Sequence, residues 1–181
     1  MRWPASLYHQ MADLGWFRGK RVELIRGEII VMSPMGSPHW VVVNLVADCL
    51  RATYAQDQFV VTEQCPISLG DDSEPEPDVA VIKGKARDFS EHLPTHCELV
   101  VEVSDSSLSF DRSSKAALYA EAGIPEYWIV DVNGRSVDVL TEPVLTESGA
   151  GYRDHATVSE GGLLLPRSAP GSVIRVADIL P

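Results

Sequence analysis

Two almost uninterrupted apolar runs constrain the fold of this chain more than any other feature. They are "PDVAVIK" at residues 77–83 and "CELVVEVS" at residues 97–104. A strand with one face in water alternates apolar and polar residues, whereas a short continuous apolar run indicates a strand covered on both faces. "EYWIVDV" at residues 126–132 reads as a further strand. The sequence therefore predicts a covered central sheet and a mixed α/β (α+β) protein.

Two helices are predicted around these strands. The first spans residues 37–54, with Ser37 as N-cap and Pro38 at the first helical position. Its inward stripe follows helical spacing and comprises His39, Val43, Val46 and Leu50. The second spans residues 110–123, capped by Asp111 or a nearby serine and closed by Gly123 before Pro125.

The remaining segments extend this core at both ends. Residues 7–16 predict a short helix, and residues 21–32 predict a hairpin that turns at Arg26-Gly27. A first strand is expected within residues 58–69, and residues 136–180 alternate as further strands. The order is helix, three strands, helix, strand, with an N-terminal hairpin and added C-terminal strands. We expect one domain over residues 1–181, with its core at about 37–132.

Composition and charge limit the classes of function. The chain has 181 residues, and no apolar run approaches the ~20 residues that span a bilayer. The N-terminus has no signal-peptide core, so a cytoplasmic protein without membrane partners is expected. Cys49, Cys65 and Cys97 are widely spaced, and we expect three buried free thiols. The net charge of −11 argues against tight nonspecific binding of DNA.

Two carboxylates stand at the ends of the apolar strands. Asp78 opens one strand, and Glu102 lies near the end of another. A buried acid needs a partner or a metal, and two carboxylates at neighbouring strand ends can share a divalent cation such as Mg²⁺ or Mn²⁺. The alternative is that both acids simply mark where the strands meet solvent.

Lys115 is the third candidate. From the helix that follows the Glu102 strand it could reach over the end of that strand, where it would orient an attacking water or neutralise developing charge. The alternative is a surface ion pair with Asp111, four positions earlier on the same helix.

The middle of the chain resembles the PD-(D/E)XK nuclease superfamily. It is most similar to a group of small bacterial proteins described as a restriction endonuclease domain. The resemblance covers nearly the whole chain, and its most specific stretch is residues 111–131. The matching stretches are Pro77-Asp78, "VVEVSD" at 100–105, "DRSSKAALYAEAGIPEYWIVD" at 111–131 and "ELIRGEIIVMSP" at 23–34.

This resemblance implies a set of site residues. The superfamily pattern places a lysine two residues after the motif acid, and Ser104 stands there in this chain. The group that the chain resembles carries its lysine on the next helix instead, which makes Lys115 a migrated catalytic lysine. Asp78 and Glu102 become metal ligands, and the Val103 carbonyl becomes a third.

Two further positions match the group's pattern less specifically. Glu28 would complete the metal site, with hairpin-surface charge as the alternative, and Glu23 has a similar but weaker claim. His39 either faces the site or is a core histidine with its hydrogen bonds satisfied.

The resulting hypothesis is a Mg²⁺- or Mn²⁺-dependent endonuclease that hydrolyses phosphodiester bonds, with DNA as the substrate that the resemblance favours. One alternative is a catalytically weak member of the same fold that serves as a binding or assembly module and forms a homodimer. Another is a metal phosphoesterase that acts on a small nucleotide-like substrate.

Overall fold

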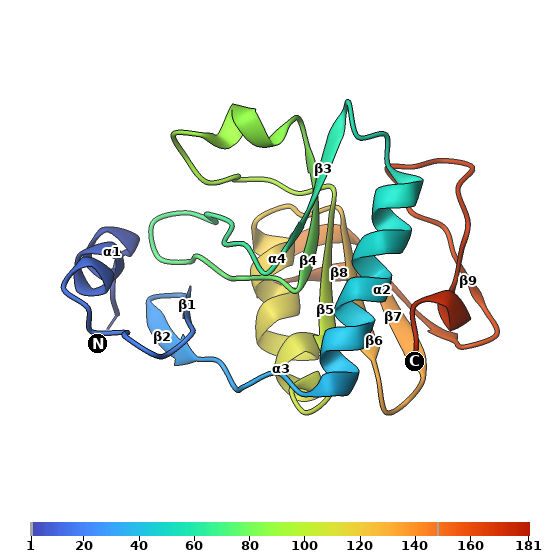
Figure 1. Ribbon diagram of the computed structural model, residues 1–181, viewed down its shortest axis with the longest axis horizontal. Helices are drawn as coiled ribbons and strands as arrows, with labels where there is room; N and C mark the ends of the chain where they lie inside the picture. Colours follow the sequence, from blue (N-terminus) through green and yellow to red (C-terminus); the bar gives the residue numbers. More distant parts are fainter. Residues whose placement is uncertain (1, 148) are drawn as a thin grey trace.

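The computed structural model describes residues 2–147 and 149–181. Figure 1 shows a twisted sheet with helices on both of its faces. The helices are α1 (Ala5–Asp13), α2 (Ser37–Thr53), η1 (Ala86–Phe89), α3 (Leu108–Phe110), η2 (Asp111–Lys115), α4 (Ala116–Glu121) and η3 (Val176–Asp178). The strands are β1 (Val22–Ile25), β2 (Glu28–Val31), β3 (Phe59–Glu63), β4 (Val79–Lys83), β5 (Leu99–Ser104), β6 (Glu126–Asp131), β7 (Ser136–Thr146), β8 (Gly149–Ser159), β9 (Leu163–Leu164) and β10 (Ile174–Arg175).

Six of the described strands form the central sheet in the order β3-β4-β5-β6-β7-β8. Strands β5 and β6 are parallel, and the other neighbours are antiparallel. The parallel pair is joined by the helical segment α3-η2-α4, as a parallel connection requires. The predicted helix, three-strand, helix, strand order is confirmed by α2, β3 to β5, the α3-η2-α4 segment and β6.

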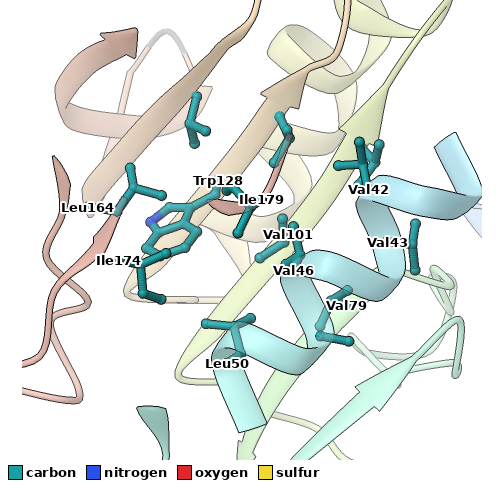
Figure 2. Close-up of a cluster of buried hydrophobic side chains, with 14 of the residues drawn as sticks. Val42, Val43, Val46, Leu50, Val79, Val101, Trp128, Leu164, Ile174 and Ile179 are labelled. Atoms are coloured by element: carbon teal, nitrogen blue, oxygen red, sulfur yellow. The ribbon is translucent and has the colours of Figure 1, made fainter. Parts of the chain in front are cut away.

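Alternate residues of the central strands supply two cores. Val79, Val101 and Trp128 face helix α2, together with residues of the C-terminal segment such as Ile179. Figure 2 shows Trp128 between Leu164, Ile174 and Ile179, with α2 alongside. On the opposite face, Val100, Ile129 and Tyr119 of α4 form the second core. Both faces of β4 and β5 are therefore covered, which explains their continuous apolar sequences.

Helix α2 is held by its buried stripe. Val43, Val46 and Leu50 are buried, as their spacing predicts. The cap differs by one position, because Gly36 has the extended conformation of an N-cap and Ser37 is already helical. β-Branched residues are weak helix formers, so tertiary packing stabilises this helix.

The other elements match their predictions with shifted boundaries. The hairpin turns at Arg26 and Gly27, which both have positive φ, as a tight two-residue turn requires. Strand β3 ends at Glu63, before the predicted boundary, because Gln64 adopts a φ of 50°. The segment from residue 173 forms only the short strand β10 and then the turn η3.

The prediction of three buried thiols is wrong for two of the cysteines. All three thiols are free, but Cys65 is exposed and Cys49 is only partly buried, while Cys97 is fully buried. Cys65 follows the early end of β3, so the sheet does not cover it. No helix in the described part of the chain is long and apolar enough to cross a membrane.

Candidate active site

Five of the six predicted site residues line one cleft at the ends of the central strands, and Glu28 is the exception. The cleft has a volume of about 240 Å³. It lies where the carboxyl end of β5 meets the start of α2 and the α3-η2 turn, and the segment from β2 to α2 forms its outer wall. In Figure 1 the start of α2 and α3 meet at the lower edge of the view. His39, Asp78, Glu102, Val103 and Lys115 all contribute to the lining.

Asp78 is buried just before β4, and both of its carboxylate oxygens are engaged. Oδ2 accepts a 2.8 Å hydrogen bond from the backbone N–H of Val103. Oδ1 lies 3.0 Å from His39 Nε2 and 3.4 Å from Gln64 Nε2. Burial lowers the pKa of His39, but the hydrogen bond to Asp78 and the nearby negative charge outweigh it, so the pKa is raised overall. His39 therefore faces the cleft and is bound to the candidate metal ligand.

Glu102 projects from β5 toward the helix on the other face. Its Oε1 accepts hydrogen bonds from Lys115 Nζ at 2.9 Å and from Tyr119 Oη at 2.7 Å. Burial raises the pKa of Glu102 to about 8, against the opposing charge of Lys115. Neighbouring carboxylates add to this increase. The free carboxylate is therefore costly here unless a cation neutralises it.

Lys115 points toward the carboxylates of the cleft. Its Nζ lies 2.9 Å from Glu102 Oε1 and 3.3 Å from Glu23 Oε2. The predicted alternative of an ion pair with Asp111 is not what the side chain forms, since Asp111 instead accepts a 2.5 Å hydrogen bond from Ser107. Burial lowers the pKa of Lys115, but the carboxylates around it raise the pKa by more, so the amine stays protonated.

Lys115 is the last residue of a π-helical turn, η2. The backbone N–H of Ala116 donates to the carbonyl of Asp111, five residues earlier. Such turns insert one residue into a helix and occur often at functional sites. Asp111 and Lys115 are both buried within the turn. Asp111 thus lies inside the helical segment, and Ser107 occupies the cap position.

The cleft holds more negative than positive charge. Four of its carboxylic acids are no more than 6% exposed, namely Glu23, Asp78, Glu102 and Asp111. The lining lysine and arginine are Lys115 and Arg21, and Arg21 is paired with Glu76 instead. Bound protons or a cation must offset the remainder, and a divalent metal is one such cation.

The available oxygen donors fit a hard cation. The described residues contain no group of three or more histidine, cysteine, aspartate or glutamate side chains placed to hold a metal. Mg²⁺, however, is commonly held by one or two carboxylates and keeps several waters. Asp78 and Glu102 supply carboxylates, and Val103, whose N–H binds Asp78, also lines the cleft. Three of the four predicted metal ligands, Asp78, Glu102 and Val103, therefore line the cleft, and the fourth, Glu28, does not.

The hairpin places its two acids differently. Glu28 is exposed at the start of β2, opposite Ile25, and does not line the cleft. Glu23, on β1, is 3% exposed and contacts Lys115 instead. It also accepts a hydrogen bond from the backbone N–H of Glu76 at 3.2 Å. Between the two, Glu23 is the acid that belongs to the cleft.

Two other contacts were not predicted from the sequence. Tyr119 donates to Glu102, and Gln64 donates to Asp78. Tyr119 follows Lys115 by four positions, so helical spacing places it on the same face, a signal that was available. Gln64 reaches the site because β3 ends early at its positive φ, which no sequence pattern indicated.

Comparison with solved structures identifies the fold. A crystal structure from Anabaena variabilis, described as "a putative nuclease belonging to DUF820", matches with a TM-score of 0.71. The match covers 88% of this chain and 89% of that one at 15% sequence identity. The fold is therefore restriction-endonuclease-like, as predicted.

Comparison of sequences supplies the family. No curated protein matches the chain. A family model, Uma2, described as "Putative restriction endonuclease", matches residues 5–177. That span includes every residue of the candidate site. The chain belongs to the Uma2 family, within the PD-(D/E)XK-like superfamily that the sequence indicated.

Proposed function

We propose that this protein is a metal-dependent endonuclease that hydrolyses phosphodiester bonds in DNA. One observation carries the proposal: Asp78, Glu102 and Lys115 come from three separate elements and converge in one cleft. Each is buried, and Lys115 is bound directly to Glu102. Membership of a family described as restriction endonucleases supports the same class of reaction.

Asp78, Glu102 and the carbonyl of Val103 would hold Mg²⁺ or Mn²⁺. When bound, such an ion supplies positive charge that lowers the pKa of a water and stabilises negative charge on the phosphate. The rest of the chemistry belongs to the side chains. A nucleophilic water must lie in line with the leaving oxygen, and the protein has to hold it there.

Lys115 has the geometry to hold that water. An ammonium has three N–H donors, and Glu102 and Glu23 accept two of them. The third donor is left for a water or a phosphate oxygen at the floor of the cleft. Since Lys115 stays protonated, its charge also offsets the charge that develops on the phosphate.

His39 has a positioning role toward Asp78. Its Nε2 and the N–H of Val103 bind different oxygens of the same carboxylate, which fixes the plane of that group. Ligand orientation of this kind is a common property of metal sites. His39 is also near enough to the cleft to exchange a proton with a leaving group.

The test is a cleavage assay on purified protein. Supercoiled plasmid and single-stranded DNA are incubated with Mg²⁺, Mn²⁺ or EDTA. We compare the wild type with Asp78→Asn, Lys115→Gln and a control, Lys83→Gln, which alters an exposed lysine at the end of β4. Cleavage is expected with either metal, absent in EDTA, lost in both site variants and unchanged in the control.

Lys115→Gln also removes a charge from a buried pair, so its fold is checked by thermal unfolding. Asp78→Asn keeps the shape of the side chain and gives a second reading if Lys115→Gln is unstable. Nuclease activity that persists in Asp78→Asn comes from a contaminant or another site and contradicts the proposal.

Two other functions have support of their own. The net charge of −11, and Ser104 at the usual lysine position, favour a catalytically weak binding or assembly module that forms a homodimer. That function predicts self-association in sedimentation and no cleavage. The small volume of the cleft favours a phosphoesterase acting on a nucleotide-like substrate. It predicts hydrolysis of bis(p-nitrophenyl) phosphate without cleavage of DNA.

A further inference from the structure

The cleft has two chemically different walls. The inner wall carries the carboxylates, Lys115 and His39, as described above. The outer wall follows β2 and the segment between β2 and α2, and its lining is mostly apolar: Ile30, Val31, Met32, Pro34 and Met35. Phe110 of α3 adds one more apolar side chain to the cleft. Val31 is 60% exposed, so this wall continues onto the open surface.

Trp40 lies at the start of α2, next to the lining residue His39. It is 58% exposed, and its backbone N–H donates to the carbonyl of Gly36, which lines the cleft. It follows His39, which contacts Asp78. A helical side chain leans toward the preceding turn, and for Trp40 that turn begins next to Gly36. An exposed indole thus follows directly on a residue that lines the candidate active site.

The cations of the cleft leave little to bind a duplex. Among the described lining residues the lysines and arginines are Arg21 and Lys115. Arg21 is paired with Glu76 at 2.9 Å, and Lys115 is paired with Glu102 and Glu23. Proteins that hold duplex DNA obtain most of their affinity from phosphate contacts to lysine and arginine. In this cleft few lysine or arginine side chains are free to contact phosphates, and the net charge of −11 further opposes the binding of a duplex.

A single strand suits this arrangement better. It has a lower charge density than a duplex, and its unpaired bases are free to stack on aromatic and apolar side chains. We propose that the cleft binds a single-stranded segment of DNA, with a phosphate at the inner wall, a base on the apolar outer wall and a neighbouring base stacked on Trp40. This inference rests on the proposed nuclease function and specifies its class of substrate.

The experiment separates binding from cleavage. Binding of a fluorescently labelled single-stranded oligodeoxynucleotide, and of the duplex of the same sequence, is measured by anisotropy with Ca²⁺ in place of Mg²⁺. Cleavage of the same two molecules is then measured with Mn²⁺. The variants are Trp40→Ala, Trp40→Phe and a matched control, Trp16→Ala. The Trp16 indole is 66% exposed, and unlike Trp40 it is not adjacent in sequence to a residue that lines the cleft.

We expect the single strand to bind at least about tenfold more tightly than the duplex. Trp40→Ala should lose about tenfold in affinity for the single strand, as expected when one stacked base is lost. Trp40→Phe should retain most of the affinity, and Trp16→Ala should match the wild type.

Three results overturn the inference: no measurable binding of the single strand, equal or tighter binding of the duplex, or equal effects of Trp40→Ala and Trp16→Ala. If the expected binding pattern is found but Mn²⁺ supports no cleavage of either molecule, the endonuclease proposal fails and the binding mode stands. Cleavage that prefers the duplex leaves the nuclease proposal intact and rejects the single-strand mode.

Discussion

Glu102 is a buried acid whose pKa is shifted both by burial and by the other charged residues of the site. It is 4% exposed and lies near Asp78, Asp111 and Glu23, with Lys115 as its direct cationic partner. Lys115 and Tyr119 both bind Oε1, and no described donor binds Oε2. Glu102 is therefore anchored through one oxygen, and the other is available to a cation.

The raised pKa of Glu102 gives a prediction about pH and stability. We expect the folded protein, between about pH 4.5 and pH 8, to retain a proton on Glu102 that the unfolded chain has released. Because the native state then binds more protons, this group's contribution to the free energy of unfolding falls as the pH rises through that window. Denaturant unfolding at several pH values measures the decline.

The matched variant is Glu102→Gln, which cannot titrate. We expect its stability to change less than that of the wild type between pH 4.5 and pH 8. If the two proteins keep the same slope across that window, Glu102 is not the titrating group and its carboxylate is ionised throughout.

The segment α3-η2-α4 is the element that positions Lys115. On one side Lys115 binds Glu102 of β5. On the other side Arg112, three residues earlier, donates to Asp138 of β7 at 2.7 Å. Asp138 is 1% exposed and also accepts a 2.7 Å hydrogen bond from Thr157. The π-helical turn is thus fixed to two strands of the same sheet.

Loss of the second attachment should loosen the turn. Arg112→Ala leaves the buried carboxylate of Asp138 without its guanidinium, and we expect a loss of about 1–2 kcal/mol in the free energy of unfolding. The control is Arg153→Ala, which breaks an exposed ion pair with Glu142 and should cost less than about 0.5 kcal/mol. Equal losses in denaturant melts would show that Arg112 is only a surface charge.

At the scale of the whole molecule, the main apolar core and the candidate site lie in different parts of the sheet. One face carries the large apolar core beneath α2, which the C-terminal segment helps to cover. Glu126 connects that segment to the sheet, because its two carboxylate oxygens accept hydrogen bonds from the indole N–H of Trp128 and the backbone N–H of Arg167. The cleft lies at one edge, where the ends of β5, α2 and η2 meet. Stability is therefore built largely away from the site.

Metal binding should stabilise the folded molecule as a whole. A ligand that binds only the native state raises the free energy of unfolding by about 2.7 kcal/mol at one hundred times its dissociation constant. We expect Mn²⁺ to raise the melting temperature of the wild type and to have little effect on Asp78→Asn. Because a buried carboxylate must lose its proton to bind a cation, the effect should grow as the pH rises toward 8.

For the wild type and for Asp78→Asn, the melting temperature in Mn²⁺ is compared with the melting temperature in EDTA. If Mn²⁺ raises the melting temperature of Asp78→Asn as much as that of the wild type, the ion binds elsewhere on this acidic chain. No rise in the wild type would remove the metal from the proposed mechanism.

The sequence by itself determined the covered sheet, its core order of elements and the positions of Asp78 and Glu102 at strand ends. Continuous apolar runs bury on both faces, and an acid within one is unusual enough to stand out. The direction of Lys115 was decided only by tertiary structure. Its flexible side chain had Asp111 in reach along the helix, and Glu102 came into reach only when η2 packed on β5. Tertiary structure also decided that Glu23, and not the predicted Glu28, lies in the cleft. The packing of the hairpin determines which of its acids is buried.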